Sequence, residues 1–316
     1  MKVTIVVRTH NRPEFLREAL ASIHLQTHTD WEVLIFDDGA TNMNFDIYRQ
    51  FKSLNSDKRV LYLTTYQSYD LFKDSWLNAP DLATGELMVR LDDDDILAED
   101  CLEYLSNLYD KNPELEFSYG SSVIFNSNGL GRLIETIAPT ECEPTRDDWA
   151  AYTIPNNHPW DKPWAFYKDF HPYPKQWTSL IHCAKSNIMC IYHTYVMRTE
   201  SVRRVKDKIT ITSNFVDDLE FLGSLDYLGL GHASLKRILT YVREHETGRV
   251  SDNGKEVLGT TMFNEHFRVR DKVDHLRTSG FFSKVIPLVT DDNFNNGVTD
   301  ELRNQFDIYY NRIKQL

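Results

Sequence analysis

An alternation of strand-like and helix-like segments runs through the first 125 residues and limits the chain to few fold classes. Apolar residues recur at helical spacing over residues 15–23 and again over residues 102–109. Short runs rich in β-branched residues predict strands at Val3–Val7, Trp31–Phe36, Val60–Thr64 and Leu87–Leu91. Because βαβ units build a parallel sheet with helices on its faces, the sequence predicts an α/β fold with a mostly parallel central sheet flanked by helices.

Polar turns follow three of these predicted strands at the point where each ends. Thr9–Arg12 follows the first strand, Asp37–Gly39 the second and Asp92–Asp95 the fourth. In an open α/β sheet the ligand crevice lies outside the carboxyl ends of the strands. We therefore expect the three turns to converge on one site.

Four consecutive carboxylates, Asp92–Asp95, end the fourth strand. Neighbouring carboxylates repel one another by on the order of 1 kcal/mol per close pair, so a positive partner is expected. One interpretation is a divalent cation such as Mg²⁺ or Mn²⁺ shared with a diphosphate, and the other is a solvated turn that caps the next helix. An EF-hand is excluded because Leu97 stands where its turn glycine would be needed.

Two further acidic pairs have both structural and functional interpretations. Asp37 and Asp38 precede Gly39, as in many turns, yet a carboxylate there could accept the imide N–H of a pyrimidine or the hydroxyls of a ribose. Asp217 and Asp218 open an apolar helical pattern, so they could cap a helix. One of them could instead act as a general base for an attacking hydroxyl. Both roles are compatible if Asp217 caps the helix and Asp218 faces the pocket.

Charge and composition restrict the partners of the chain. Its 47 acidic and 35 basic residues give a net charge of −12, which argues against a surface that coats nucleic acid. No apolar run is long enough to span a bilayer and the first residues do not form a signal peptide, so a cytoplasmic protein without a transmembrane segment is expected. The cysteines lack metal-site spacing and are expected to be reduced structural thiols. His24 and His28 lack the acidic partner of a zinc motif.

Beyond about residue 135 the regular alternation of strand-like and helix-like segments is interrupted. Residues 149–177 hold five prolines among tryptophans and tyrosines, which predicts a long ordered loop or lid. Helical patterning is expected again after Glu200 and Asp217, and a strand at Leu239–Arg243. The last 60 or so residues are of mixed charge and are predicted to be helical.

The order of these motifs resembles that of the family 2 glycosyltransferases, which are inverting enzymes with a GT-A fold. The resemblance covers roughly residues 1–255. The segments that carry it are Thr9–Arg12, Gln26–Thr27 with Trp31–Glu32, Asp37–Ala40, Ala83–Met88 leading into Asp92–Asp94, Asp217–Asp218 and Arg243–Ser251. In the family these segments correspond to the T-x-N-R turn, the approach to the second strand, the DDGS element, the D-x-D strand, the catalytic acidic pair and the R-x-H-x-x-S-x-S loop.

The resemblance implies a Rossmann-like sheet and a domain organisation. Residues 1–255 would form the GT-A domain, with a nucleotide-sugar-binding half over 1–125 and an acceptor-binding half over 126–255. The Trp/Pro-rich insertion would occupy residues 135–190. Residues 256–316 would form a C-terminal helical extension.

The resemblance also implies an activity: metal-dependent, inverting transfer of a sugar from a nucleotide-diphosphate sugar to a hydroxyl of a glycan or other saccharide. A UDP-sugar is the first expectation for the donor. Asp218 would be the catalytic base beside Asp217, and Asp94 with Asp92 would hold Mn²⁺ or Mg²⁺. The residues implied in nucleotide-sugar binding are Arg8, Thr9, Asn11, Arg12, Asp37, Asp38, Asn78, Asp92, Asp93, His245 and Arg249.

The sequence departs from the family pattern in two motifs and in the gap of 123 residues from Asp94 to Asp217, which is longer than expected, and it leaves other classes open. Trp76-Leu77-Asn78 stands where the family has a small residue, Arg and Asn, so a cation is missing there and Lys73 or Arg249 could substitute. Asp217 replaces the commoner Glu. The other classes are a nucleotidyltransferase gripping pyrophosphate through Arg8 and Arg12, an inactive sugar-nucleotide-binding relative, and a sugar transferase acting on a modified base in DNA.

Overall fold

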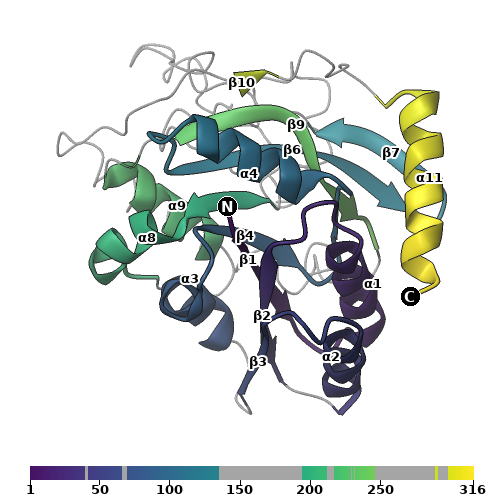
Figure 1. The fold of residues 1–316 in the computed structure, drawn as a ribbon, viewed down its shortest axis with the longest axis horizontal. Coiled ribbons are helices and arrows are strands. Elements are labelled where there is room, and N and C mark those ends of the chain that lie inside the picture. The colour runs from purple at the N-terminus through teal and green to yellow at the C-terminus, as the bar shows by residue number, and fades with distance from the viewer. Residues whose placement is uncertain are drawn as a thin grey trace, which may run out of the picture.

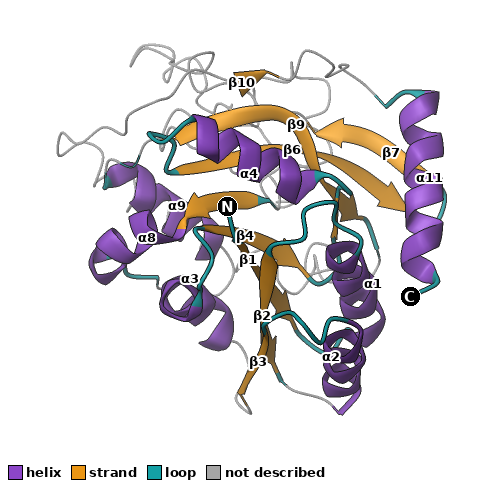
Figure 2. Cartoon of the chain, viewed as in Figure 1, coloured by secondary structure: helices purple, strands orange, loops and turns teal. Residues whose placement is uncertain are grey.

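The structure is a computed structural model, and it describes residues 1–39, 42–65, 70–134, 194–211, 217–228, 230, 232–245, 289–290 and 298–316. The described residues form a mixed ten-stranded sheet with helices on both faces (Figures 1 and 2). The strands are β1 (Val3–Thr9), β2 (Trp31–Asp38), β3 (Val60–Thr65), β4 (Leu87–Asp92), β5 (Ile96–Leu97), β6 (Phe117–Asn126), β7 (Gly129–Ile134), β8 (Tyr195–Arg198), β9 (His232–Arg243) and β10 (Val289–Thr290). The helices are α1 (Pro13–His24), α2 (Asn42–Leu54), α3 (Asp70–Leu82), α4 (Cys101–Lys111), α8 (Thr199–Val205), α9 (Asp217–Tyr227) and α11 (Asp300–Lys314), with a short 3-10 helix, η2 (Lys206–Lys208).

The strands are ordered β10-β9-β6-β8-β4-β1-β2-β3, with β5 paired to β9 and β7 paired to β6. β4, β1, β2 and β3 are mutually parallel, as the sequence predicts. β8 runs antiparallel to both β4 and β6, whereas β6 and β9 are parallel. The antiparallel β8 thus joins two parallel sets of strands.

Side-chain alternation along the strands divides the interior into two cores. The odd positions Val3, Ile5 and Val7 of β1 pack in one core with α1, α4 and α11. The even position Val6 lies in a second core with α3, α8 and α9. In Figure 1, α3, α8 and α9 lie together on one side of the sheet, and α1 and α2 lie on the other. Because both faces of β1 are covered, all of its residues are buried, and the polar Thr4 has a partner, since its hydroxyl donates to Glu32 Oε1 at 2.7 Å.

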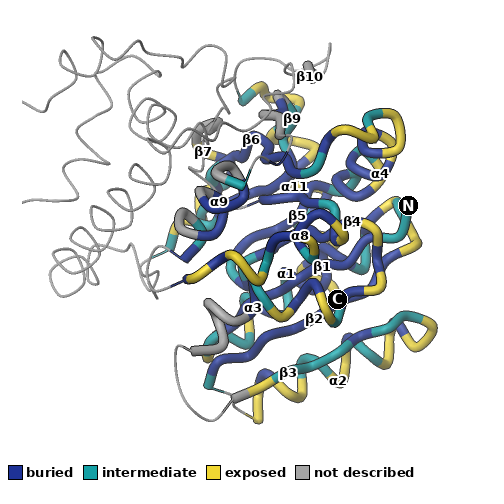
Figure 3. Tube along the Cα trace, turned by 90° about the vertical axis from the view of Figure 1, so that its left-hand side faces the viewer, coloured by how far each residue is buried: buried dark blue, intermediate teal, exposed yellow. Residues whose placement is uncertain are grey.

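The C-terminal helix α11 belongs to the first core. Thr299 caps it by accepting a hydrogen bond from the Leu302 amide at 3.1 Å. Phe306, Tyr309 and Ile313 are buried in the same core as β1 and α1. Figures 1 and 3 show α11 beside α1, so the predicted helical segment is confirmed over Asp300–Lys314. The boundary at residue 255 stays a prediction.

Several elements were not expected from the sequence. The helix α2 was missed because its pattern is weak, with only Asn44 and Phe51 buried. β6 was missed because Gly120 and buried serines interrupt its apolar pattern. β9 begins at His232, seven residues before the predicted strand. The predicted loop of residues 149–177 lies outside the described residues.

The cysteines and the paired histidines have structural surroundings. Cys101 is a buried free thiol, as predicted, whereas the other cysteines lie outside the described residues. His24 Nδ1 lies 2.8 Å from Asn55 Oδ1, and His28 Nε2 lies 3.0 Å from the Met1 carbonyl oxygen, so the two imidazoles have separate partners. None of the described helices is long and apolar enough to cross a membrane.

Candidate functional site

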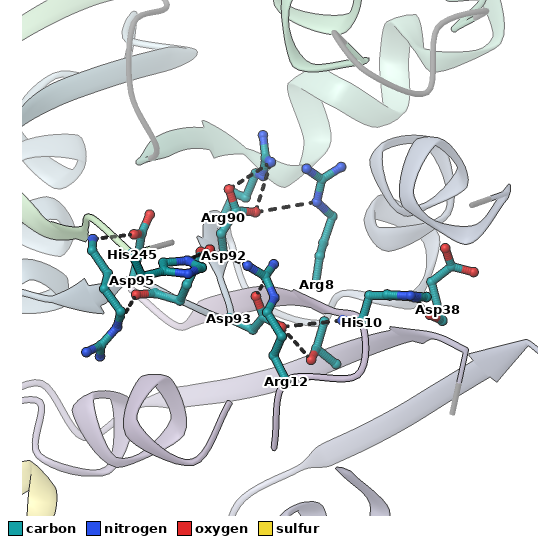
Figure 4. A network of polar contacts seen from close by, with 12 residues as sticks. Arg8, His10, Arg12, Asp38, Arg90, Asp92, Asp93, Asp95 and His245 are labelled. Carbon is teal, nitrogen blue, oxygen red and sulfur yellow. Dashed lines mark hydrogen bonds and ion pairs between the residues drawn. The ribbon is translucent and has the colours of Figure 1, made fainter. Parts of the chain in front are cut away.

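The carboxyl ends of β1 and β4 bring the predicted polar turns together. The two strands are parallel neighbours, with Arg8 opposite Asp92. Even positions of these strands face α3 and α9, where Val6 and Met88 pack, and odd positions face α1. The carboxylates at the end of β4 therefore lie on two sides of the sheet and contact different residues on each side (Figure 4).

On the α3 side, two buried arginines bridge two carboxylates. Arg8 and Arg90 are each 6% exposed. The Arg90 guanidinium donates to both oxygens of Asp92, at 2.9 and 3.1 Å, and Arg8 Nε lies 3.6 Å from Asp92. Arg8 also forms an ion pair with Asp217, the first residue of α9. We call Arg8, Arg90, Asp92 and Asp217 the arginine network, because it links β4 to α9.

Trp76 completes the surroundings of this network from α3. Its indole Nε1 donates to Asp217 Oδ2 at 2.6 Å. The guanidinium carbons of Arg90 and Arg8 lie 4.7 and 5.6 Å from the centre of its ring, within range of a cation–π contact. Trp76, Arg8 and Arg90 also line a cavity of about 20 Å³, large enough for about one water molecule. Trp76, which stands where the family has a small residue, thus donates a hydrogen bond to Asp217 and packs against Arg8 and Arg90.

Asp217 and Asp218 differ in their surroundings. Asp217 is 3% exposed, and its Oδ2 accepts hydrogen bonds from both Arg8 and Trp76. Burial raises the pKa of Asp217, but the positive charges of Arg8 and Arg90 outweigh it and hold that pKa below the ordinary value. Asp218 is partly exposed. Of the pair, Asp218 is therefore the more exposed residue.

On the α1 side, Asp93 anchors the turn that we call the carboxylate turn, Asp92–Asp95. Its Oδ2 accepts hydrogen bonds from Thr9 Oγ1 at 2.7 Å and from the His10 amide at 3.3 Å. Arg12 lies 2.6 Å from its other oxygen. Burial raises the pKa of Asp93 to about 7, although Arg12 opposes the shift. These contacts hold the turn against the start of α1.

Asp94 lies at the more open part of the carboxylate turn. It forms an ion pair with Arg12, and its Oδ2 lies 3.0 Å from His245 Nε2. The side chains of Asp92 and Asp94 are 20% and 19% exposed. Figure 4 shows His245 beside this turn.

The side chains around Asp94 fit a divalent cation that is coordinated jointly by the protein and by a bound diphosphate. Within the described part of the chain, no group of three or more His, Cys, Asp or Glu side chains is arranged to hold a metal ion by itself. A cation bound to nucleotide needs only one or two protein carboxylates, because phosphate oxygens and water fill its other positions. Asp94 and the adjacent His245 could provide the protein ligands, with Asp92 nearby. An imidazole ligand would favour Mn²⁺ over Mg²⁺.

The turn after β2 packs against the turn after β1. Asp37 is buried and accepts hydrogen bonds from Asn44 Nδ2 at 3.1 Å and from the Tyr62 hydroxyl. Burial also raises the pKa of Asp37. The imidazole of His10 donates to the Asp38 carbonyl oxygen, and a Cβ at Gly39 would lie 3.0 Å from that ring. Gly39 has φ +106°, which favours glycine.

The other residues predicted for the site are not part of the arginine network. Asn11 is exposed, with φ +51°, and its amide nitrogen lies 3.3 Å from His10 Nε2. Asn78 is exposed on α3. Arg249 and the side chain of Lys73 lie outside the described residues. The sequence reasoning missed Arg90, although an arginine inside an otherwise apolar strand signals a buried charge that needs a partner.

The fold and the carboxylates at its strand ends define a class of protein, the glycosyltransferases with a GT-A fold. The family model described as Glycosyl transferase family 2 matches residues 4–192, more than half of the chain. The chain therefore belongs to this family, as the order of its motifs predicted.

A curated relative and two solved structures illustrate the similarity. The UDP-Glc:alpha-D-GlcNAc-diphosphoundecaprenol beta-1,3-glucosyltransferase WfgD of Escherichia coli is 29% identical over 129 residues, which is 40% of this chain and 48% of that protein. S. aureus TarS in complex with UDP-GlcNAc is 16% identical with a TM-score of 0.53, over 80% of this chain and 61% of that chain. The mannosyltransferase PcManGT from Pyrobaculum calidifontis in complex with GDP-Man and Mn²⁺ is 15% identical with a TM-score of 0.50, over 87% and 68%.

The similarities to the solved structures concern the fold, and the curated relatives are matched over only part of their length. At 15% and 16% identity, the two solved structures establish the fold alone. The alignments span about half the length of some curated relatives and about a fifth of others.

Proposed function

We propose that the chain is a metal-dependent inverting glycosyltransferase. It moves a sugar from a nucleotide-diphosphate sugar, with a UDP-sugar as the first candidate, to a hydroxyl of a glycan or other saccharide. The observation that carries the proposal is the arginine network, which joins Asp92 of the carboxylate turn to Asp217 beside Asp218. The proposed donor-binding residues and the candidate base thus belong to one site.

Asp218 is the proposed general base. It accepts the proton of an acceptor hydroxyl while the oxygen attacks the anomeric carbon. The new bond from carbon to acceptor oxygen forms as the bond to the diphosphate oxygen breaks, and the nucleoside diphosphate leaves on the opposite face. Configuration therefore inverts. Asp217, held by Arg8 and Trp76, fixes the first turn of α9 and so orients its neighbour.

The donor is proposed to bind along the ends of β1, β2 and β4. Asp94 and His245, with Asp92 nearby, would hold Mn²⁺ or Mg²⁺, which when bound offsets the charge of the departing diphosphate. Arg12 pairs with Asp93 and Asp94 and is proposed to act by holding this turn and not by gripping the phosphates. Asp38, Thr9 and Asn11 are the proposed nucleoside contacts, and Asp37 acts through the contacts that fix this strand end. The UDP-sugar in the name of WfgD supports a UDP-sugar donor.

The nucleotidyltransferase interpretation is less well supported. Its only sequence candidates for gripping pyrophosphate were Arg8 and Arg12. Arg8 is buried between Asp92 and Asp217, and Arg12 is paired with Asp93 and Asp94. Pairing with carboxylates competes with binding of a pyrophosphate by the same guanidinium groups.

The test is nucleotide release from a panel of UDP-, GDP- and CDP-sugars with Mn²⁺, with and without EDTA. We expect release from one donor class, stimulated by saccharide acceptors and abolished by EDTA. An absence of release from every donor, with and without acceptors, would contradict the proposal and favour an inactive sugar-nucleotide-binding relative.

A further inference from the structure

The guanidinium group of Arg243, the last residue of β9, lies between the carboxylate turn and the C-terminal helix. Its Nε donates to the Asp94 carbonyl oxygen at 3.0 Å, and its backbone amide donates to Asp95 Oδ1 at 3.1 Å. Its two terminal nitrogens donate to Glu18 of α1 at 2.5 Å and to the Tyr310 hydroxyl of α11 at 2.9 Å. One side chain therefore connects the turn to α1 and α11.

Aromatic rings confine this guanidinium group. Its central carbon lies 4.5 Å from the centre of the Phe125 ring, 4.8 Å from that of Phe15 and 5.7 Å from that of Tyr310. The Arg243 side chain is only 10% exposed. Cation–π contacts of this kind strengthen as the charge loses water, so the position of the group is well defined.

Tyr310 closes the connection from α11. Its hydroxyl accepts from Arg243 and donates to Glu18 Oε2 at 2.8 Å, so the three side chains form a closed set of hydrogen bonds. The Tyr310 ring packs against Phe125 and Phe306, with ring centres 5.4 and 5.3 Å apart. The hydroxyl thus orients the arginine, while the ring belongs to the core.

His245 follows Arg243 by two residues and reaches the same turn. Its imidazole contacts the Asp94 carboxylate at 3.0 Å and lies edge-on to Phe15, with ring centres 4.6 Å apart. Arg243 therefore sets the main chain on both sides of the Asp94–His245 contact. A shift of its guanidinium group would change the spacing of these two side chains.

We propose that α11 positions the Asp94–His245 pair through Tyr310 and Arg243, and thereby sets the affinity for a nucleoside diphosphate bound with a divalent cation. Tyr310 is a positioning residue here, because it acts through Arg243. The part concerning affinity rests on the proposed function. Residues that orient a metal ligand change affinity when altered, even without touching the ligand.

The test compares two tyrosines that are adjacent on α11. Tyr310→Phe removes the hydroxyl bound to Arg243 and keeps the packed ring. Tyr309→Phe is the matched control, because the Tyr309 hydroxyl donates to the carbonyl oxygens of Leu97 and Ser22, at 3.0 and 3.3 Å, and not to Arg243. Glu18→Gln is a second test variant, because it alters the carboxylate that accepts hydrogen bonds from both Arg243 and Tyr310. Binding of UDP and of GDP with MnCl₂ is measured by calorimetry, and amide hydrogen exchange of residues 92–95 is measured without ligand.

We expect Tyr310→Phe and Glu18→Gln to weaken nucleotide binding roughly tenfold and to speed exchange in the carboxylate turn. Tyr309→Phe should lower thermal stability but leave both measurements at the wild-type values. Wild-type affinity and exchange in Tyr310→Phe, or equal effects of the two tyrosine variants, would overturn the inference. Failure of the wild type to bind either nucleotide would contradict the proposed function instead, and the exchange comparison would still decide the positioning role.

Discussion

Asp217 and Asp218 are neighbours in the chain, yet Asp217 is buried and Asp218 is partly exposed. We predict that Asp218→Asn lowers kcat by at least about a hundredfold, the usual scale of a general base. Nucleotide binding should persist, because the proposed donor contacts lie on other elements. Steady-state kinetics and calorimetry with UDP or GDP check the two parts, and turnover close to that of the wild type would exclude Asp218 as the base.

Asp217→Asn provides the contrast at the adjacent position. It keeps the shape of the side chain but removes one of the charges that balance Arg8 and Arg90. Breaking a buried ion pair from one side typically costs about 3 to 5 kcal/mol. Denaturant unfolding should therefore show a large loss of stability in Asp217→Asn and little change in Asp218→Asn.

The individual residues of the site were predictable to different degrees. Asp92 and Asp218 stand out in the sequence because acidic residues gather at a strand end and at a helix start. Their partners do not, because the contact between Trp76 and Asp217 joins positions 141 apart in the chain and depends on how α3 packs against α9. The pairing of Arg90 with Asp92 depends on which face of β4 each side chain occupies.

At the scale of elements, Glu32 ties the start of β2 to its neighbours. This buried carboxylate accepts hydrogen bonds from Thr84 at 2.5 Å, Thr4 at 2.7 Å and Arg59 at 2.9 Å. Burial alone would raise its pKa, but the hydrogen bonds from Thr84, Thr4 and Arg59 lower the pKa of Glu32 to about 2. The Glu of the sequence motif is thus a structural residue.

We predict that Glu32→Gln lowers the free energy of unfolding at pH 7 by about 3 kcal/mol, since each pKa unit is worth about 1.4 kcal/mol. Because the pKa is lower in the folded state, the contribution is complete above the unfolded pKa of about 4.5 and is lost as the pH falls towards about 2. Urea unfolding at pH 7, 5 and 3.5 should show the difference from wild type shrinking at the lowest pH.

The exposed Glu86 is the control for this prediction. Its side chain accepts a long hydrogen bond, 3.3 Å, from the Lys2 amide. Glu86→Gln should change stability by less than about 0.5 kcal/mol at any of these pH values. A similar loss in both variants would mean that the effect follows net charge and not the contacts of Glu32.

Elements with a strong pattern were predictable, and those shaped by tertiary packing were not. The strands β1 to β4 match the predicted segments within two residues at each end. The strands β1, β2 and β4 are buried almost continuously, and the partly buried edge strand β3 keeps an apolar run over Val60–Leu63. β6 is buried as well, but its serines and Gly120 pack closely against β9, where a Cβ at position 120 would lie 2.3 Å from a Leu239 side-chain atom. That close approach is visible only once the two strands are paired.

At the scale of the whole molecule, the site draws on distant parts of the chain. Residues from β1, β4, α9 and the end of β9 meet there, and they come from both cores of the sheet. Part of the excess of acidic residues is therefore local, since several carboxylates cluster at one end of the sheet. Unfolding must separate all of these segments, so ligand binding is expected to stabilise the described core as a unit.

We therefore predict that Mn²⁺ and the preferred nucleoside diphosphate together raise the melting temperature. A ligand at a hundred times its Kd stabilises the folded state by about 2.7 kcal/mol, which for a chain of this length corresponds to roughly 4 °C. EDTA should remove most of the shift, and Mg²⁺ should replace Mn²⁺ less well, because the imidazole of His245 favours a transition metal. Asp218→Asn serves as the control that should keep the full shift, since binding and proton transfer are separate. A nucleotide shift that is unchanged by EDTA would contradict the proposed role of Asp94 and His245.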